Sequence, residues 1–236
     1  MSRSLKKLRN CLQCAGSKIL DKAIPLSGLQ AALCARYGYG LTVRSEDEPY
    51  FFHLPDIAAD SRQTALLREA VLPDEESLLR LRRRTRPGMT IVEACVGCGA
   101  RSIFYAKSMR AGRVYALGGT EREVSAGRKN ILLNGAENAA QVHLLNPGGN
   151  AAPGALDSFC RERKFEKVDL LSLDGPGLAL AGLESAKEIL RRHGPAIILW
   201  GQSGEEAAKA KDFLDSMGYA APEAWTSGIS FWMSRL

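Results

Sequence analysis

From residue 90 onward, short apolar segments alternate with longer amphipathic segments. The apolar segments have the length of strands and lie at residues 90–95, 113–117, 141–145, 168–173, 196–200, from 219 onward and at 229–233. The amphipathic segments have the length of helices and lie at residues 100–110, 121–134, 156–164, 180–192 and 205–217. Such alternation is typical of βαβ units, in which parallel strands form one sheet with helices on both faces. The sequence therefore predicts an α/β fold built on a mostly parallel sheet.

The chain before residue 70 lacks this alternation, and we predict an N-terminal extension at residues 1–69 and a main domain at residues 70–236. Residues 2–20 have leucines at helical spacing with basic residues between them, and residues 37–60 are typical of one or two short strands. The basic helix is expected to pack on the main domain. The alternatives are a partner-binding arm and a weak peripheral contact of residues 1–20 with a membrane surface.

The net charge of +6 is concentrated at the front of the chain, where residues 1–89 carry 15 basic and 10 acidic side chains. The arginines from Arg80 to Arg86 lie in and just after a helix predicted at residues 74–85. Leucines on that helix supply an opposing buried side, so the run predicts a solvated face rather than a nucleic-acid surface. No apolar run approaches the length of about 18 residues that is needed to span a bilayer. The N-terminus also lacks the apolar core of a signal peptide. We therefore expect a cytoplasmic protein without a transmembrane segment.

A glycine-containing turn joins the strand at residues 90–95 to the following helix, with the sequence Ala94-Cys95-Val96-Gly97-Cys98-Gly99. Glycines let the backbone turn tightly and approach a ligand, and the start of the helix offers unpaired N–H groups. In open α/β sheets, ligands bind beyond the carboxyl ends of the strands, which is where this turn must lie. The turn is therefore the predicted ligand-binding site.

The segment TIVEACVGCGARSIFYA at residues 90–106 resembles the first motif of class I S-adenosylmethionine-dependent methyltransferases, and most closely that of the FkbM-type methyltransferases. Residues 113–135 are similar to the second strand and helix of that family, and residues 168–200 to its fourth strand, crossover helix and fifth strand. The resemblance covers about residues 70–236. It implies a Rossmann-like methyltransferase fold with a seven-stranded sheet.

The same resemblance implies that S-adenosylmethionine is the cofactor. The implied cofactor-binding residues surround the turn and the end of the second strand: Glu93, Cys95, Val96, Gly97, Gly99, Gly118 and Gly119. Asp174, at the end of the fourth strand, is the implied catalytic residue, because a base must lie within hydrogen-bond reach of the acceptor hydroxyl.

Several positions depart from the family pattern. The first glycine of the motif is Cys95 here, and its asparagine is Gly97. The acid that binds the ribose hydroxyls falls on Gly118, and the glutamates after the fourth and fifth strands fall on Pro176 and at or beside Gly201. Losing a carboxylate that bonds two hydroxyls is expected to weaken cofactor binding about 10- to 1000-fold.

Two other acids, Glu121 and Glu123, start the helix that follows Gly118. Their position favours capping of the helix dipole over replacement of the strand-end acid. If the pocket is otherwise intact, the substitution Gly118→Glu is expected to strengthen cofactor binding.

Two main functions are compatible with these residues, and a third alternative is a peripheral membrane or nucleic-acid adaptor that uses the basic front segment. The first is an FkbM-type O-methyltransferase that acts on a hydroxyl of a sugar or secondary metabolite, so that its partner is a small-molecule or glycan acceptor. The second is a catalytically inactive homologue that serves as a partner or scaffold subunit for another protein. Cys11 and Cys14 are too far in sequence from Cys95 and Cys98 to suggest a four-cysteine zinc site, and no metal is predicted.

Overall fold

The computed structural model describes residues 39–46, 48–55, 57, 60–69, 71–145, 154–175, 179–226 and 228–235. The predicted basic helix at residues 2–20 lies outside the described residues. The chain divides into two compact units, with the boundary between Glu75 and Glu76.

The first unit contains a β-hairpin and a helix. Strands β1 (Tyr39–Ser45) and β2 (Glu48–Leu54) pair antiparallel along their whole length, and helix α3 (Ser61–Glu69) follows. Tyr50 and Phe52 are buried whereas Phe51 between them is exposed, the alternation of a strand with one apolar face. The short strands expected at residues 37–60 are therefore present.

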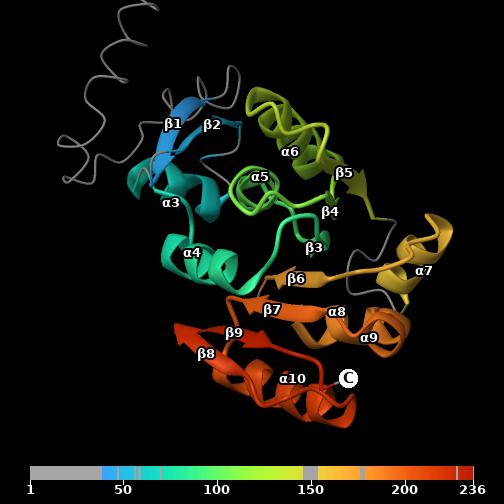
Figure 1. Cartoon of the computed structure of the whole chain (residues 1–236). Helices are drawn as coiled ribbons and strands as arrows, with labels where there is room; N and C mark the ends of the chain where they lie inside the picture. The colour runs from blue at the N-terminus through green and yellow to red at the C-terminus, as the bar shows by residue number, and fades with distance from the viewer. Residues whose placement is uncertain are drawn as a thin grey trace, which may run out of the picture. The chain divides into compact units, whose positions relative to one another are not determined.

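A seven-stranded sheet forms the centre of the second unit (Figure 1). Its strands are β3 (Thr90–Ala94), β4 (Arg113–Gly118), β5 (Ala140–Leu144), β6 (Leu170–Asp174), β7 (Ala196–Trp200), β8 (Glu223–Thr226) and β9 (Ile229–Trp232). They lie in the order β5-β4-β3-β6-β7-β9-β8. Strands β3 to β7 are parallel, while β9 runs antiparallel to both of its neighbours. The predicted α/β fold with a mostly parallel seven-stranded sheet is confirmed.

Helices alternate with these strands along the chain. They are α4 (Glu75–Arg84), α5 (Ala100–Lys107), α6 (Glu121–Leu133), α7 (Ala155–Glu162), α8 (Ala179–Ser185), α9 (Lys187–His193) and α10 (Gly204–Ser216). Helices α5 and α6 pack together, and α8 packs against α7 and α10, so the two groups cover the two faces of the sheet. In the described parts of the chain, no helix has both the length and the apolar content needed to cross a membrane.

Neighbouring residues of a strand face different layers of the second unit. Val92, Leu171 and Leu199 belong to an apolar core that they share with α7, α8, α9 and α10. Glu93 and Ser172 are register partners on the adjacent strands β3 and β6, and both contact α5. One side of the sheet is therefore apolar, whereas the other carries a row of buried polar groups beneath α5.

The single helix predicted at residues 180–192 is wrong, because the structure has two helices that meet at Ala186. The carboxylate of Asp157 on α7 accepts hydrogen bonds from the backbone N–H groups of Glu188 and Ile189, each at 2.9 Å. These bonds satisfy the first turn of α9 as a capping side chain does. Asp157 lies 31 residues before Glu188, so the local sequence pattern does not reveal the break.

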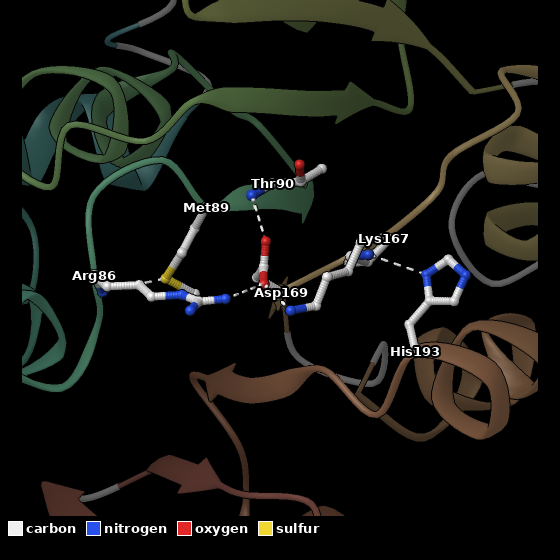
Figure 2. Close-up of polar contacts among 7 residues, drawn as sticks. Arg86, Met89, Thr90, Lys167, Asp169 and His193 are labelled. Atoms are coloured by element: carbon white, nitrogen blue, oxygen red, sulfur yellow. Dashed lines mark hydrogen bonds and ion pairs between the residues drawn. The ribbon is translucent and has the colours of Figure 1, made fainter.

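Asp169 lies immediately before β6 and joins strands at the amino edge of the sheet (Figure 2). Its Oδ2 accepts a hydrogen bond from the backbone N–H of Thr90 at 2.9 Å, and its Oδ1 lies 2.8 Å from Lys167 Nζ. Arg86 Nη2 lies 3.5 Å from the same Oδ1. Burial alone raises the pKa of Asp169, but the bonds from Lys167 and Thr90 outweigh burial and hold this pKa below its usual 3.8.

Candidate functional site

The turn between β3 and α5 lies at the carboxyl edge of the sheet. The backbone N–H groups of Cys95 and Val96 both donate to the carbonyl of Leu117 at 3.0 Å, which ties the turn to the end of β4. The φ angle is positive at Cys95 (70°), Gly97 (53°) and Gly99 (85°). Glycine adopts such angles without steric cost, whereas cysteine there costs about 1–2 kcal/mol. The backbone therefore has the shape of a glycine motif even where Cys95 replaces the glycine.

Helix α6 holds this turn in place. A Cβ at Gly99 would lie 3.3 Å from the Cα of Gly127 on α6, so the two backbones approach closely. The side-chain amide of Asn130 is fully buried and donates to the carbonyl of Cys98 at 2.9 Å. Asn134 caps the end of the same helix. Asn130 and Asn134 thus have structural roles, and Asn130 fixes the turn directly.

Glu93 is buried between β3 and α5, with 1% of its surface exposed. Ser102, on the first turn of α5, donates a short hydrogen bond to Glu93 Oε2. A buried carboxylate requires such a partner, because burial without compensation is costly. The hydrogen bond between Glu93 and Ser102 therefore holds the first turn of α5 against β3. Contact of Glu93 with a cofactor stays a prediction.

A second polar contact under α5 joins Tyr105, Ser172 and Trp200. The Trp200 indole N–H donates to Ser172 Oγ at 2.9 Å, and the Tyr105 hydroxyl lies 2.9 Å from the same oxygen. All three side chains are buried. Burial, and then the negative charge of Glu93, raise the pKa of Tyr105 far above its usual value. The phenol therefore stays protonated and takes part in the site only as a neutral hydrogen-bonding group.

Asp174, the predicted catalytic residue, lies at the carboxyl end of β6 and pairs with Arg101 of α5. Arg101 Nη1 lies 2.7 Å from Asp174 Oδ2, and both side chains are only 9% exposed. The guanidinium also lies over the Trp200 ring, 4.3 Å from its centroid. These contacts place Arg101 at the carboxyl edge between β6 and β7, where it neutralises the charge of Asp174. The catalytic role of Asp174 stays a prediction.

The end of β4 offers no room for a side chain at Gly118. A Cβ there would lie 2.9 Å from Val124 Cγ2, 3.3 Å from Val96 Cγ1 and 3.3 Å from Glu123 Cβ. A contact under 3.0 Å to a branched, packed side chain requires a shift of the surroundings. This crowding therefore opposes the stronger cofactor binding that was expected from Gly118→Glu. The sequence did not reveal the crowding.

The predicted cofactor-binding residues lie together around the carboxyl ends of β3 and β4, and Asp174 ends the strand β6 that neighbours β3. Sequence reasoning missed Ser102, which bonds Glu93, and Arg101, which pairs with Asp174. It also missed the neighbouring contact of Tyr105 with Ser172. The available indication was a polar residue inside an otherwise apolar segment, as Ser172 is within residues 170–173. Pro176, Cys11 and Cys14 lie outside the described residues.

Among the described residues, the other polar groups do not form a second site of this kind. Within the part of the chain that the structure describes, no group of three or more His, Cys, Asp or Glu residues is placed to hold a metal ion. A pocket of about 280 Å³ lies between α7 and α9, with Cys160, Arg161, Lys164 and Arg192 in its lining. Burial raises the pKa of Cys160 to about 12, so this thiol is unreactive. Because the lining also includes Phe165 and His193, which precede β6 and β7, the pocket lies at the amino edge, away from the turn.

The family model that matches this chain is the methyltransferase FkbM domain, which aligns with residues 69–221. The chain belongs to the FkbM methyltransferase family. The predicted resemblance to this family is thereby confirmed over residues 69–221. No curated protein matches the sequence.

Solved structures share the fold of this FkbM-domain protein at low sequence identity. One is the ribosomal protein L11 methylase from Lactobacillus delbrueckii subsp. bulgaricus, with 17% identity, 69% of this chain and 78% of that chain covered, and a TM-score of 0.51. Another is precorrin 8w decarboxylase from Methanobacterium thermoautotrophicum, with 17% identity, coverage of 68% and 89%, and a TM-score of 0.50. A third is a protein of the NADB-Rossmann superfamily from Streptococcus agalactiae, with 13% identity, coverage of 66% and 65%, and a TM-score of 0.50.

The residues of this FkbM domain fit a nucleoside methyl donor at the turn more fully than at the end of β4. The turn keeps its positive φ angles and its tie to Leu117. At the end of β4, the space above Gly118 is taken by Val96, Glu123 and Val124. Any carboxylate that binds a ribose at this corner therefore has to come from outside β4.

Proposed function

We propose that the chain is an S-adenosylmethionine-dependent O-methyltransferase that acts on a hydroxyl of a sugar or secondary metabolite. The sulfonium of the bound cofactor supplies an electrophilic methyl group. Transfer of this methyl group would form a bond from its carbon to the hydroxyl oxygen, break the carbon–sulfur bond to leave a thioether, and release the hydroxyl proton. Membership of the FkbM methyltransferase family supports the reaction type.

One observation carries this proposal. The turn of residues 95–99 keeps positive φ angles at Cys95, Gly97 and Gly99, and Leu117 and Asn130 hold it at the carboxyl edge. Retention of a left-handed backbone at Cys95, which is costly for a side chain other than glycine, favours a turn kept for a ligand. Within the proposal, the backbone of this turn binds the methionine part of the cofactor.

Asp174 is the proposed acceptor of the hydroxyl proton, and Arg101 is its positioning partner. The ion pair between them fixes the carboxylate at the end of β6, next to β3 and its turn. Transfer from a sulfonium depends chiefly on alignment and proximity of the two reacting atoms. Within the proposal, the fixed carboxylate therefore contributes by orienting the hydroxyl toward the methyl group.

The second candidate is a catalytically inactive member of the family that acts as a partner or scaffold subunit. The same buried pair of Arg101 and Asp174 favours it, because a carboxylate that already has a cationic partner is well suited to stabilise a fold. The absence of a side chain at Gly118 also favours it.

Thermal unfolding and titration calorimetry with S-adenosylmethionine and S-adenosylhomocysteine test the proposal, with NAD as the control nucleotide. A ligand at 100 times its Kd stabilises the folded state by about 2.7 kcal/mol, which raises the Tm by several degrees. The expected result is such a shift with both sulfur ligands and none with NAD. Absence of binding at millimolar concentration would sink the enzyme proposal. Binding without transfer of a labelled methyl group to any of a panel of sugar and phenolic hydroxyls would favour the second candidate.

A further inference from the structure

Glu123, on the first turn of α6, folds back over the end of β4. Its Oε2 accepts a hydrogen bond from the backbone N–H of Gly119 at 2.8 Å. The backbone N–H of Glu123 donates to the side chain of Thr120, the N-cap of the helix, at 3.2 Å. Backbone and side chain are thus both fixed, and the carboxylate is held beside the residue that follows β4.

Gly118 provides the room for this arrangement. A Cβ at Gly118 would lie 3.3 Å from Glu123 Cβ, which is closer than ordinary contact. A side chain at the end of β4 would therefore crowd the first turn of α6, with Val124 Cγ2 closest at 2.9 Å. Glycine at position 118 thus lets the first turn of α6, which carries Glu123, lie close against the end of β4.

The Glu123 carboxylate has capacity for a ligand. A carboxylate has about four acceptor sites, and among the described residues Gly119 is the donor to this one. Glu123 is half-buried, whereas Glu121 on the same turn of the helix is exposed. The side chain therefore combines a fixed position with access from the carboxyl edge, where the neighbouring turn lies.

From this geometry we propose that Glu123 binds the ribose hydroxyls of the cofactor in place of a strand-end acid. The inference rests on the proposed function. In βαβ units that bind nucleosides, an acid that follows the second strand accepts hydrogen bonds from the ribose. Glu123 supplies an acid at that end of β4, five residues later in the chain than Gly118. The ligand class is a ribonucleoside with free 2′ and 3′ hydroxyls.

The test uses titration calorimetry on the full chain with two probes, S-adenosylhomocysteine and its 2′,3′-dideoxy analogue. Glu123→Gln is expected to weaken binding of S-adenosylhomocysteine about 10- to 100-fold, because hydrogen bonds to a charged acceptor become bonds to a neutral one. The dideoxy analogue is expected to bind the wild type and this variant with similar affinity. Glu121→Gln is the matched control and leaves both affinities unchanged.

The outcomes separate this inference from the proposed function. Equal weakening of both probes by Glu123→Gln means that the residue only caps the helix, and it overturns the ribose role while cofactor binding stands. An unchanged affinity of that variant for S-adenosylhomocysteine has the same meaning. Failure of the wild type to bind S-adenosylhomocysteine overturns the proposed function and the ribose role together. Melting of each variant without ligand verifies that it is folded.

Discussion

Two aspartates at opposite ends of β6 differ in the exposure of their cationic partners. Asp169, at the amino edge, accepts a backbone hydrogen bond from Thr90 and has cationic partners, Lys167 and Arg86, whose side chains are 55% and 73% exposed (Figure 2). Asp174, at the carboxyl edge, pairs with Arg101, and both of these side chains are 9% exposed. The cationic partners of Asp169 are thus exposed to solvent, whereas the cationic partner of Asp174 is buried.

This difference indicates which edge of the sheet has the more strictly fixed side-chain geometry. Solvent screens an exposed ion pair, and its partners move at little cost. A buried pair has lost its hydration, and loss of one partner leaves the other charge without compensation. The carboxyl edge, with Arg101 and Asp174, is therefore the end at which side-chain geometry is strictly specified, while the amino edge tolerates change.

The largest expected effect is at Arg101. The substitution Arg101→Met leaves the buried Asp174 carboxylate without its cation and is expected to lower the free energy of unfolding by about 3–5 kcal/mol. Chemical denaturation measures this loss. The double variant Arg101→Met, Asp174→Asn removes both charges and is expected to recover part of it. A loss below about 1 kcal/mol for the single variant would show that side-chain geometry is no more strictly specified at the carboxyl edge than at the amino edge.

A smaller effect at the same edge comes from Gly118. The substitution Gly118→Ala places a Cβ 2.9 Å from Val124 Cγ2 and is expected to cost about 1–3 kcal/mol through strain. Gly119→Ala is the matched control, since its Cβ meets its nearest atom, Glu123 Oε2, at 3.7 Å. Urea unfolding of the two variants compares the positions directly. Equal stability of both would mean that the carboxyl edge is loosely packed at Gly118.

Most of the fold was predictable from the sequence, because strand and helix periodicity is a local property. Strands β3, β4 and β7 lie where strands were expected at residues 90–95, 113–117 and 196–200, except that β3 ends at Ala94 and Cys95 belongs to the turn. The prediction failed at residues 180–192, where the side chain of Asp157, distant in sequence, begins a new helix. Periodicity identifies an element, but it does not identify a capping group from elsewhere in the chain.

The candidate site was predictable as a location and less so as a set of contacts. The turn around Gly97 and the strand-end residue Asp174 follow from topology, since the carboxyl ends of neighbouring parallel strands meet. The ion pair of Asp174 with Arg101 depends on how α5 is rotated over the sheet. The crowding at Gly118 depends on the side chain of Val124. Both are tertiary features that no short pattern carries.

At the amino edge, a loss of folding stability is expected on substitution of Asp169. The substitution Asp169→Asn removes the ion pairs with Lys167 and Arg86, while an amide oxygen still accepts from Thr90, so we expect a loss of about 1–2 kcal/mol at pH 7. The folded state holds the pKa of Asp169 below 3.8. The contribution of this carboxylate is therefore complete above that value and is lost as pH falls through the folded pKa. Denaturation from pH 7 to pH 3 is expected to show the stability gap between wild type and variant narrowing below about pH 4. A constant gap would contradict the charge-based role.

The smallest expected effect is at His193, also at the amino edge. Its Nδ1 accepts a hydrogen bond from the backbone N–H of Val168 at 3.0 Å, which only the neutral ring accepts (Figure 2). Burial, and then the charge of Arg192, hold the pKa of His193 below its usual 6.5. The unfolded chain therefore takes up this proton first, so stability is complete above about pH 6.5 and declines as pH falls through the folded pKa. His143, whose pKa is lowered chiefly by burial, contributes in the same direction.

The variant His193→Asn isolates the contribution of this one histidine, because its amide oxygen accepts from Val168 at every pH in this range. We expect it to lose less stability than the wild type between pH 7 and pH 5, by about 0.5 kcal/mol, a magnitude near the lower limit for a single neutral hydrogen bond. The measurement is the free energy of unfolding across that range, with His143→Gln as a second single variant. Parallel profiles for wild type and His193→Asn would mean that the bond from Val168 survives protonation through movement of the ring. The amino edge would then be even more tolerant of change than its exposed ion pairs suggest.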